Sequence, residues 1–318
     1  MKIVVLDGLL VCYGGLSWEP ISRHGALTIY DATEPDEIVA HIHDADAIFT
    51  NRCPISAETM ARCPNLKFIG TFGTGYNAVD IEEARRRSIA VCNTPAYGVH
   101  AVAQMSVALL LEIVCNTARF DRYIKEAGWC QAVDPAVCAI DQRELFGKTA
   151  GILGMGDIGS TVANILMALG MNILATRRHP DPSLESDRLR FVSAQELFAG
   201  SDVISIHCPL NDQTRGMINA KAIAGMRDGA ILINTARGAV WEEAAVVAAL
   251  DSGKLYAVGS DVFCDEPAGK SHPLACHPRC VATPHVSWAP RETRMRVIDI
   301  CGANLGAFLA GEAQSRIV

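Results

Sequence analysis

The sequence predicts an α/β protein with two Rossmann-like, doubly wound parallel-sheet domains and a cleft between them. Three observations lead to this prediction. Short apolar runs alternate with helix-length segments, as in parallel sheets covered by helices. A glycine-rich turn follows one such run in the middle of the chain, and polar side chains follow several later ones. Half of the 318 residues are hydrophobic, which is enough to fill two cores.

The first third of the chain predicts one sheet. A helix is expected at 36–45, between the second and third of five expected strands, which are 2–7, 26–31, 46–50, 66–72 and 89–94. A long apolar helix is expected at 100–118, followed by a polar, irregular stretch at 125–145.

The pattern then restarts and predicts a second sheet with six or seven strands, typical of a dinucleotide-binding domain. The candidates are 149–154, 171–176, 190–193, 202–209, 230–236, 256–263 and 280–285. An amphipathic helix is expected at 291–311, starting after Pro290 and packing back on the first domain. We therefore expect a discontinuous substrate-binding domain, 1–99 plus 287–318, and a dinucleotide-binding domain, 100–286.

Composition excludes several classes of function. A net charge of −7 argues against a nucleic-acid partner. The most apolar segment, 101–114, is too short to cross a bilayer, and the first residues do not resemble a signal peptide. Scattered cysteines suit a reducing compartment, so we expect a cytoplasmic protein without a membrane partner. The segment 276–280 (CHPRC) has no second ligand cluster, so no metal site is expected.

The glycine-rich turn predicts a dinucleotide site. In GMGDIG, residues 154–159, the first glycine permits a tight turn, the second lets the backbone approach a pyrophosphate, and the third allows close helix–strand packing. The start of the following helix would face the phosphates. The predicted contacts are Gly154, Met155, Gly156, Asp157, Ile158 and Gly159.

Three polar residues follow successive strands, where open α/β sheets bind ligands. Arg237 offers a planar fork for a carboxylate or a 2-oxo acid. Glu266 and His285 form a possible acid–base pair, because a histidine beside a carboxylate can donate a proton near neutral pH. Taken singly, each has a structural alternative: a surface salt bridge, a solvated loop acid, and a capping or core histidine.

The order GxGxxG, NTARG, DVFxxEP and PHxxW resembles the D-2-hydroxyacid dehydrogenase family over nearly the whole chain. The resemblance implies that Arg237 binds the substrate carboxylate and oxo group, that His285 exchanges the proton, and that Glu266 supports His285. It also implies that Thr74 and Gly75 bind the carboxylate through their N–H groups and that Trp288 lines the substrate pocket. Further residues expected against the cofactor are Thr176, Cys208, Pro209, Thr235, Ala236, Asp261 and His285.

The segment LATRRHP, 174–180, bears on the cofactor. NAD-preferring members of the family end this strand with an acid that holds the ribose hydroxyls. Here Arg177 and Arg178 stand at that position, and two guanidiniums suit a 2′-phosphate. Thr176 could add a hydroxyl, and Asp181 could still reach the ribose. We therefore predict a preference for NADP(H), with NAD(H) use possible.

The glycerate dehydrogenase and hydroxypyruvate or glyoxylate reductase branch is most similar, through GYNAVD and PHVSWAPRE. The predicted activity is reduction of a small 2-oxo acid to the D-2-hydroxy acid. Two alternatives stay open: a dinucleotide-sensing, corepressor-like binding protein, and a dehydrogenase for another 2-oxo acid such as a phosphoglycerate-type substrate. A homodimer is expected, with the exposed apolar side of 100–118 and the 125–145 segment at its interface.

Overall fold

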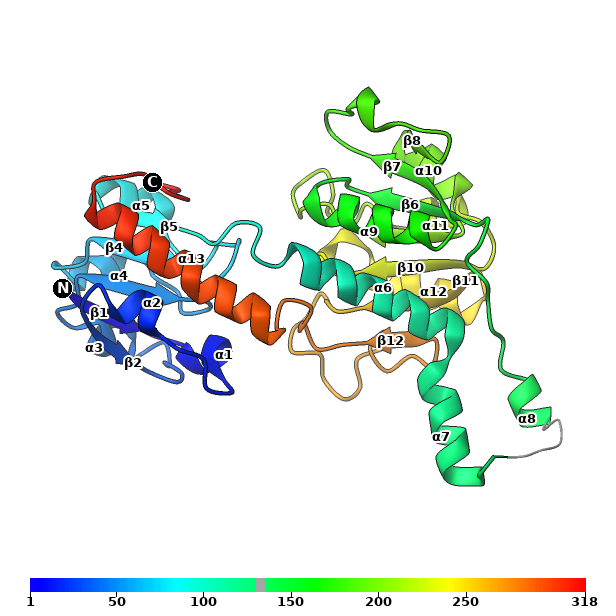
Figure 1. Ribbon diagram of the computed structural model, residues 1–318, viewed down its shortest axis with the longest axis horizontal. Helices are drawn as coiled ribbons and strands as arrows, with labels where there is room; N and C mark the ends of the chain where they lie inside the picture. The colour runs from blue at the N-terminus through cyan, green and yellow to red at the C-terminus, as the bar shows by residue number, and fades with distance from the viewer. Residues whose placement is uncertain (130–134) are drawn as a thin grey trace. The chain divides into compact units, whose positions relative to one another are not determined.

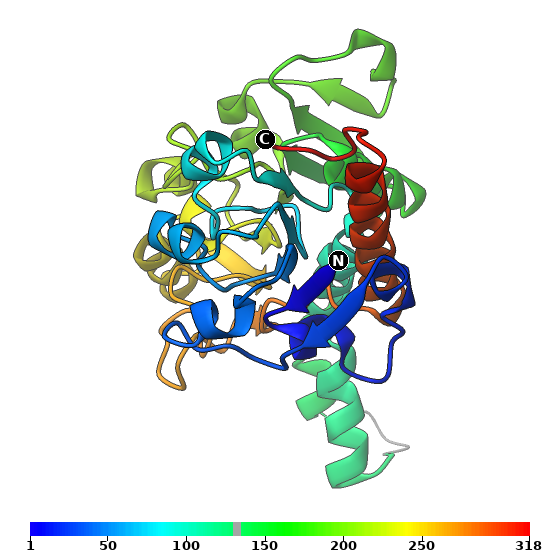
Figure 2. The same ribbon diagram turned by 90° about the vertical axis from the view of Figure 1, so that its left-hand side faces the viewer.

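The protein divides into two compact units, and the computed structural model describes residues 1–129 and 135–318. Unit 1 comprises Met1–Gly98 and Trp288–Val318, and unit 2 comprises Val99–Ser287. Each boundary lies one residue from the expected one. Figures 1 and 2 show each unit as a sheet with helices on both faces, which confirms the predicted α/β fold class.

Unit 1 holds a five-stranded parallel sheet in the order β2-β1-β3-β4-β5. The strands are β1 (Lys2–Val5), β2 (Ala26–Ile29), β3 (Ala47–Thr50), β4 (Phe68–Thr71) and β5 (Ala90–Cys92). The helices are α1 (Gly8–Cys12), α2 (Glu19–Ser22), α3 (Ile38–Ile42), α4 (Ala57–Arg62), α5 (Ile81–Arg86) and α13 (Arg291–Leu309).

The two faces of this sheet bury separate cores because side chains alternate along each strand. In β1, Ile3 and Val5 join the core covered by α1, α2 and α13. Val4 joins the opposite core, covered by α3, α4 and α5. Helix α13, the last helix of the chain, supplies Val297, Ile298, Cys301 and Leu305 to the first of these cores.

Unit 2 holds a seven-stranded parallel sheet in the order β12-β11-β10-β9-β6-β7-β8. The strands are β6 (Thr149–Leu153), β7 (Asn172–Thr176), β8 (Leu189–Phe191), β9 (Val203–Ile206), β10 (Ala230–Asn234), β11 (Leu255–Ser260) and β12 (Cys280–Ala282). Its helices are α6 (Val99–Cys115), α7 (Thr117–Ala127), α8 (Pro135–Cys138), α9 (Asp157–Ala168), α10 (Ala194–Gly200), α11 (Ala220–Ala224), α12 (Glu243–Asp251) and the short 3-10 turns η1 (Pro182–Leu184) and η2 (Gly238–Val240).

Strand order places the ligand edge of unit 2. Apolar residues of α6 and α9 cover one face of the sheet, and those of α10, α11 and α12 cover the other. The order reverses between β6 and β9, and this fold class binds its ligands outside the carboxyl ends of the strands at such a point.

The expected helix at 100–118 is wrong in its extent. Helix α6 ends at Cys115, Asn116 takes a left-handed conformation with φ 53°, and α7 continues after a 52° bend. The carboxylate of Glu112 accepts hydrogen bonds from Ala118 N and from the Thr117 hydroxyl, which fixes the start of α7 at the bend. The expected irregular stretch at 125–145 contains the end of α7 and all of α8, and 130–134 lie outside the described residues.

Every segment expected as a strand contains one, but several end earlier than expected. The run 202–209 forms a strand only over Val203–Ile206, and 256–263 only over Leu255–Ser260. The apolar residues continue past the strands because the loops at the carboxyl edge are themselves buried, Val262 and Phe263 among them. Among the described residues no single helix is long and apolar enough to cross a bilayer; only the bent pair α6–α7 reaches that length and composition.

Candidate active site

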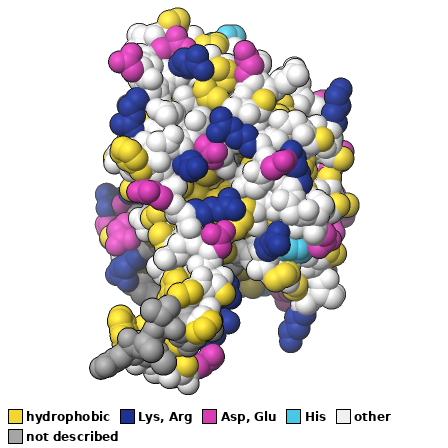
Figure 3. Space-filling model, turned by 90° about the vertical axis from the view of Figure 1, so that its right-hand side faces the viewer, with side chains coloured by type: hydrophobic (Ala, Val, Ile, Leu, Met, Phe, Trp, Pro, Cys, Tyr) yellow, Lys and Arg dark blue, Asp and Glu magenta, His cyan; other side chains and the backbone are white. Residues whose placement is uncertain are grey.

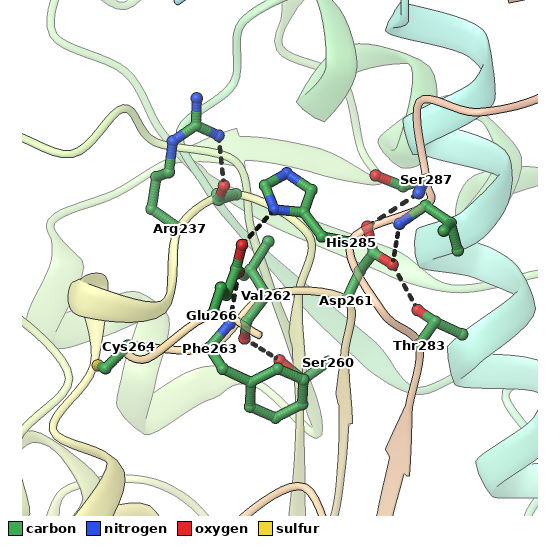
Figure 4. Close-up of polar contacts among 12 residues, drawn as sticks. Arg237, Ser260, Asp261, Val262, Phe263, Cys264, Glu266, Thr283, His285 and Ser287 are labelled. Atoms are coloured by element: carbon green, nitrogen blue, oxygen red, sulfur yellow. Dashed lines mark hydrogen bonds and ion pairs between the residues drawn. The ribbon is translucent and has the colours of Figure 1, made fainter. Parts of the chain in front are cut away.

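Three predicted residues lie at one edge of the sheet of unit 2. Arg237 follows β10, Glu266 follows β11, and His285 follows β12, and these strands are neighbours in the sheet. Because all strands are parallel, their carboxyl ends meet at the same edge. Figure 4 shows the three side chains on neighbouring loops of that edge.

The imidazole of His285 is paired with the carboxylate of Glu266. Nδ1 of His285 lies 2.6 Å from Oε2 of Glu266, and Oε1 accepts a hydrogen bond from Phe263 N at 2.9 Å. Both side chains are one-third exposed. With Nδ1 donating to the carboxylate, Nε2 is the ring nitrogen through which a proton can be exchanged with a ligand.

The loop that carries Arg237 is shaped by Asn234. Its side-chain amide donates to Arg237 O at 3.0 Å, and its Oδ1 accepts from Ala236 N at 3.0 Å. A Cβ on Gly238 would lie 2.1 Å from the carbonyl carbon of Phe263, so the backbones of the two loops touch. The exposed guanidinium donates to Ala236 O at 2.7 Å and keeps further N–H groups for a ligand.

Asp261, predicted to contact the cofactor, is fully buried beside His285. Its Oδ1 accepts hydrogen bonds from the Thr283 hydroxyl at 2.6 Å and Val286 N at 2.9 Å, and its Oδ2 accepts one from Ser287 N at 2.9 Å. The carboxylate therefore faces the segment that contains His285, as the dashed lines in Figure 4 show.

The glycine-rich turn has the geometry that a dinucleotide needs. Gly154 takes φ 99°, and a Cβ there would lie 2.7 Å from Cys208 N at the end of β9. A Cβ on Gly159 would lie 2.4 Å from Gly154 O, whereas nothing stands within 4 Å of a Cβ position on Gly156. Helix α9 starts after Gly156 without a side-chain cap. Open space and uncapped N–H groups together fit a pyrophosphate.

The end of β7 presents two cations. Arg177 and Arg178 are both exposed. The Thr176 hydroxyl accepts a hydrogen bond from Gly154 N at 3.0 Å, which links this strand end to the glycine-rich turn. Asp181 instead accepts from Ser183 N and the Ser183 hydroxyl, at 3.0 and 2.7 Å. These hydrogen bonds, with the charge of Arg177 as a smaller cause, lower the pKa of Asp181.

The loop after β9 lies on the other side of the turn. Burial raises the pKa of the Cys208 thiol to about 11, so this thiol stays protonated, and Pro209 beside it is exposed. Thr235, after β10, is buried and shares a 2.7 Å hydrogen bond with Ser106 of α6, while Ala236 is half-buried. His207 contacts the Ser205 hydroxyl at 2.8 Å.

We expect His207 to lower the stability of the protein in acid. Burial lowers the pKa of its imidazole from 6.5 to about 4, so within this range the unfolded chain binds a proton that the folded chain does not. The free energy of unfolding should therefore fall as the pH drops through this range, by at most about 3 kcal/mol because part of the residue is accessible. Urea unfolding of wild type and His207→Gln at several pH values measures this. Equal pH dependence in both proteins would contradict it.

The predicted carboxylate loop belongs to unit 1. Asn93 donates to Thr74 O at 2.9 Å, and the Thr74 hydroxyl donates to Thr94 O at 3.2 Å, so the loop is held from the end of β5. In the described part of the chain neither Thr74 N nor Gly75 N has a hydrogen-bond partner, and a Cβ on Gly75 would meet open space. Half-buried Trp288 is also in unit 1.

Beside this loop, Asp7 holds the end of β3. Its carboxylate is buried after β1 and accepts hydrogen bonds from Asn51 N at 2.8 Å and Arg52 N at 2.7 Å. Burial raises the pKa of Asp7, against the lowering effect of these bonds.

Sequence reasoning missed the residues that shape these loops, namely Asp7, Asn93, Asn234, Gly238 and Thr283. All five lie near the carboxyl end of an expected strand, and this position could have marked them. For the four polar ones, however, position does not show whether the side chain faces a ligand or the protein's own backbone. Within residues 1–129 and 135–318, no group of three His, Cys, Asp or Glu side chains is arranged to hold a metal ion.

Comparisons with known proteins agree on one family. Residues 107–287 match the family described as D-isomer specific 2-hydroxyacid dehydrogenase, NAD binding domain. The chain is 41% identical to a hydroxypyruvate reductase of Blautia hydrogenotrophica, covering 98% of both chains. It is 33% identical to a glyoxylate reductase of Aeropyrum pernix, covering 94% of this chain and 91% of the relative. The solved structure of the TT0316 protein from Thermus thermophilus superposes with a TM-score of 0.89, at 33% identity and full coverage of both chains.

Proposed function

Because this chain belongs to the D-isomer specific 2-hydroxyacid dehydrogenase family, and is therefore an oxidoreductase that uses a nicotinamide cofactor, we propose that it reduces a small 2-oxo acid to the D-2-hydroxy acid. The observation that carries the proposal is the 2.6 Å pair of His285 Nδ1 and Glu266 Oε2 at the sheet edge that also bears Arg237. A proton donor and a guanidinium at one edge are what reduction of a 2-oxo acid needs.

The proposed mechanism assigns a role to each of these residues. Arg237 binds the substrate through its guanidinium, and its charge stabilises the oxygen that becomes negative during reduction. Thr74 N and Gly75 N bind the substrate carboxylate. His285, protonated and oriented by Glu266, gives the proton at Nε2 to the substrate oxygen. Residues 154–159 and the loops after β7 and β9 would hold the nicotinamide cofactor, which would be the source of the hydride when bound.

Hydroxypyruvate and glyoxylate are the proposed substrates. The support is the similarity to relatives named hydroxypyruvate reductase and glyoxylate reductase. A panel of glyoxylate, hydroxypyruvate, pyruvate and phenylpyruvate, each with NADH and with NADPH, tests this. A kcat/KM for phenylpyruvate above those for both small acids would contradict the substrate assignment. Absence of turnover on every acid would instead favour a dinucleotide-sensing role.

NADP(H) is the proposed preferred cofactor. Arg177 and Arg178 are exposed directly after β7, the strand next to the glycine-rich turn, where they can meet a 2′-phosphate. Asp181, the nearest acid along the chain, is engaged with Ser183. Its carboxylate thus caps η1, and this engagement argues against a contact between Asp181 and the ribose of the cofactor.

We expect Arg177→Asp to shift the preference toward NADH. The substitution removes one charge-assisted contact and adds a carboxylate that repels a 2′-phosphate, so the ratio of kcat/KM with NADPH to that with NADH should fall by about 10- to 100-fold. Arg190→Asp, at an exposed arginine of β8, is the matched control and should leave the ratio unchanged. A wild-type protein that prefers NADH would show that the two arginines serve another purpose.

The protein is proposed to be a cytoplasmic homodimer. The described cysteines form no disulfide, which fits a reducing compartment. The apolar side of α6 does not support the expected interface, because it is buried in unit 2 against α9 and the sheet. The exposed large apolar side chains in this region are Leu111 in α6, Ile124 in α7, Trp129 and Phe146. Figure 3 shows one face of the protein, with hydrophobic side chains scattered among charged ones. Light scattering should give the mass of a dimer; a monomer would contradict this assignment.

A further inference from the structure

His285 is held in a backbone conformation that a histidine rarely adopts. Its φ of 52° lies in the left-handed region, which is unfavourable for a residue with a side chain. Such a conformation persists only where neighbouring groups determine it. The pair with Glu266 fixes the ring at one nitrogen but does not act on the backbone.

Asp261 supplies most of the hydrogen bonds to the backbone around His285, beside a 3.1 Å bond from His285 N to Thr283 O and a 2.9 Å bond from Thr283 N to Ser260 O. Its carbonyl accepts His285 N at 2.8 Å. Its carboxylate accepts the Thr283 hydroxyl two residues before His285, and the N–H groups of Val286 and Ser287 directly after it. A single residue thus holds the segment on both sides of the histidine. Figure 4 shows Glu266 and Asp261 on opposite sides of His285.

Asp261 is itself fixed in position by its neighbours. Asp261 is fully buried, and its own N–H donates to Asn234 O at 2.9 Å, so it is tied to β10 as well as to the end of β11. Neighbouring Ser260 is buried too and donates to Val262 O at 2.7 Å. The three donors take three of the roughly four acceptor positions that a carboxylate offers, two on Oδ1 and one on Oδ2.

We propose that Asp261 is a positioning residue, which places the proton-donating His285 by fixing the backbone of residues 283–287. The proposal rests on the proposed function for its kinetic readout alone. A displaced imidazole would still meet cofactor and substrate but would transfer its proton poorly, because rates fall steeply with misplacement of about 1 Å.

The test compares Asp261→Asn, Asp261→Ala and Thr283→Val. The amide keeps an acceptor for one part of the segment but sets an NH2 group against a backbone N–H, whereas alanine removes all three bonds. We expect kcat to fall about tenfold in Asp261→Asn, about a hundredfold in Asp261→Ala and about threefold in Thr283→Val. The dissociation constant of NADPH, measured by fluorescence, should change less than about twofold.

A second readout follows the histidine itself. The Nδ1 proton shared with Glu266 gives an NMR resonance that should shift or broaden in the Asp261 variants, although Glu266 is unchanged. Asp202→Asn is the matched control: Asp202 also accepts a backbone N–H, from Thr149 at 2.9 Å, but at the opposite end of the strands. It should alter neither kcat nor the resonance.

Two results would overturn the proposal. One is an Asp261→Asn protein with wild-type kcat. The other is a rise of about tenfold or more in the NADPH dissociation constant, equivalent to about 1.4 kcal/mol, with an unchanged histidine resonance, which would make Asp261 a cofactor ligand. If the Asp261 variants do not fold, Thr283→Val tests the proposal instead, through kcat and through the resonance of the His285 Nδ1 proton. A wild-type protein without reductase activity would contradict the proposed function, while the resonance would still test the positioning role.

Discussion

His285→Ala is expected to lower kcat for every accepted 2-oxo acid by at least about a hundredfold. General acid catalysis by a positioned side chain contributes about 10²- to 10⁴-fold, and alanine leaves the substrate oxygen without its proton donor. Binding of the dinucleotide should change little, because the glycine-rich turn and the end of β7 are untouched. Steady-state kinetics with saturating cofactor, together with direct cofactor titration, separates the two effects.

The chain offers a matched control for this variant. His277 also pairs with a carboxylate, its Nε2 lying 3.3 Å from Asp251 Oδ1, but it precedes β12 and so stands at the other end of that strand. His277→Ala should leave kcat within about twofold of wild type, since His277 lies at the end of β12 opposite to the edge that bears His285 and Arg237. Near-normal kcat in His285→Ala would show that another group donates the proton.

Arg237→Ala is the second substitution with a large expected effect. It removes both the fork that binds the substrate and the charge that stabilises the developing oxyanion, and loss of one such donor costs about 10²- to 10³-fold. We expect kcat/KM to fall by at least about a hundredfold, with both a lower kcat and a higher KM. The backbone of the loop should persist, because Asn234 holds it through the Arg237 carbonyl.

Arg237→Lys and Arg227→Ala complete this experiment. Lysine keeps the charge but loses the planar fork, so its kcat/KM should lie between those of wild type and the alanine variant. Arg227 pairs with Asp202 at 2.9 Å, at the amino end of the same sheet, and its loss should not affect turnover. Equal kcat/KM for Arg237→Ala and Arg227→Ala would exclude Arg237 from substrate binding.

The alternation of apolar runs with helix-length segments allowed the strands of both sheets to be predicted, because buried parallel strands leave short apolar runs in the sequence. The glycine-rich turn was predicted from its spacing of glycines directly after such a run. The break at Asn116 could not be predicted in this way, because an asparagine inside an apolar run does not by itself show that the backbone turns left-handed there. In the folded chain the Glu112 carboxylate accepts hydrogen bonds from the first residues of α7. Asp181 did carry a local signal, since an aspartate two residues before a serine can close a turn with its own backbone.

The sequence allowed us to predict which residues reach the candidate site, but not the directions in which their side chains point. Arg237, Glu266 and His285 followed from their positions after successive strands. The family resemblance also marked Asp261, as a cofactor contact, yet its carboxylate is buried and bonded to the backbone of residues 286 and 287. Position along a strand tells which edge a residue reaches, whereas the direction of its side chain depends on donors, here Val286 N and Ser287 N, that only the folded chain brings near.

The divided unit 1 has a consequence for biosynthesis. Phe49 and Phe68 leave the ribosome before unit 2 is made, but α13, which covers them with Val297, Ile298 and Leu305, is translated only after unit 2. At roughly 5–20 residues per second, the nascent unit 1 waits on the order of ten seconds or more with one apolar face of its sheet uncovered. Unit 2 is continuous and can fold during that interval. The amino-terminal part of the nascent chain is therefore where ribosome-associated chaperones would be needed, and premature termination within α13 would leave an aggregation-prone product.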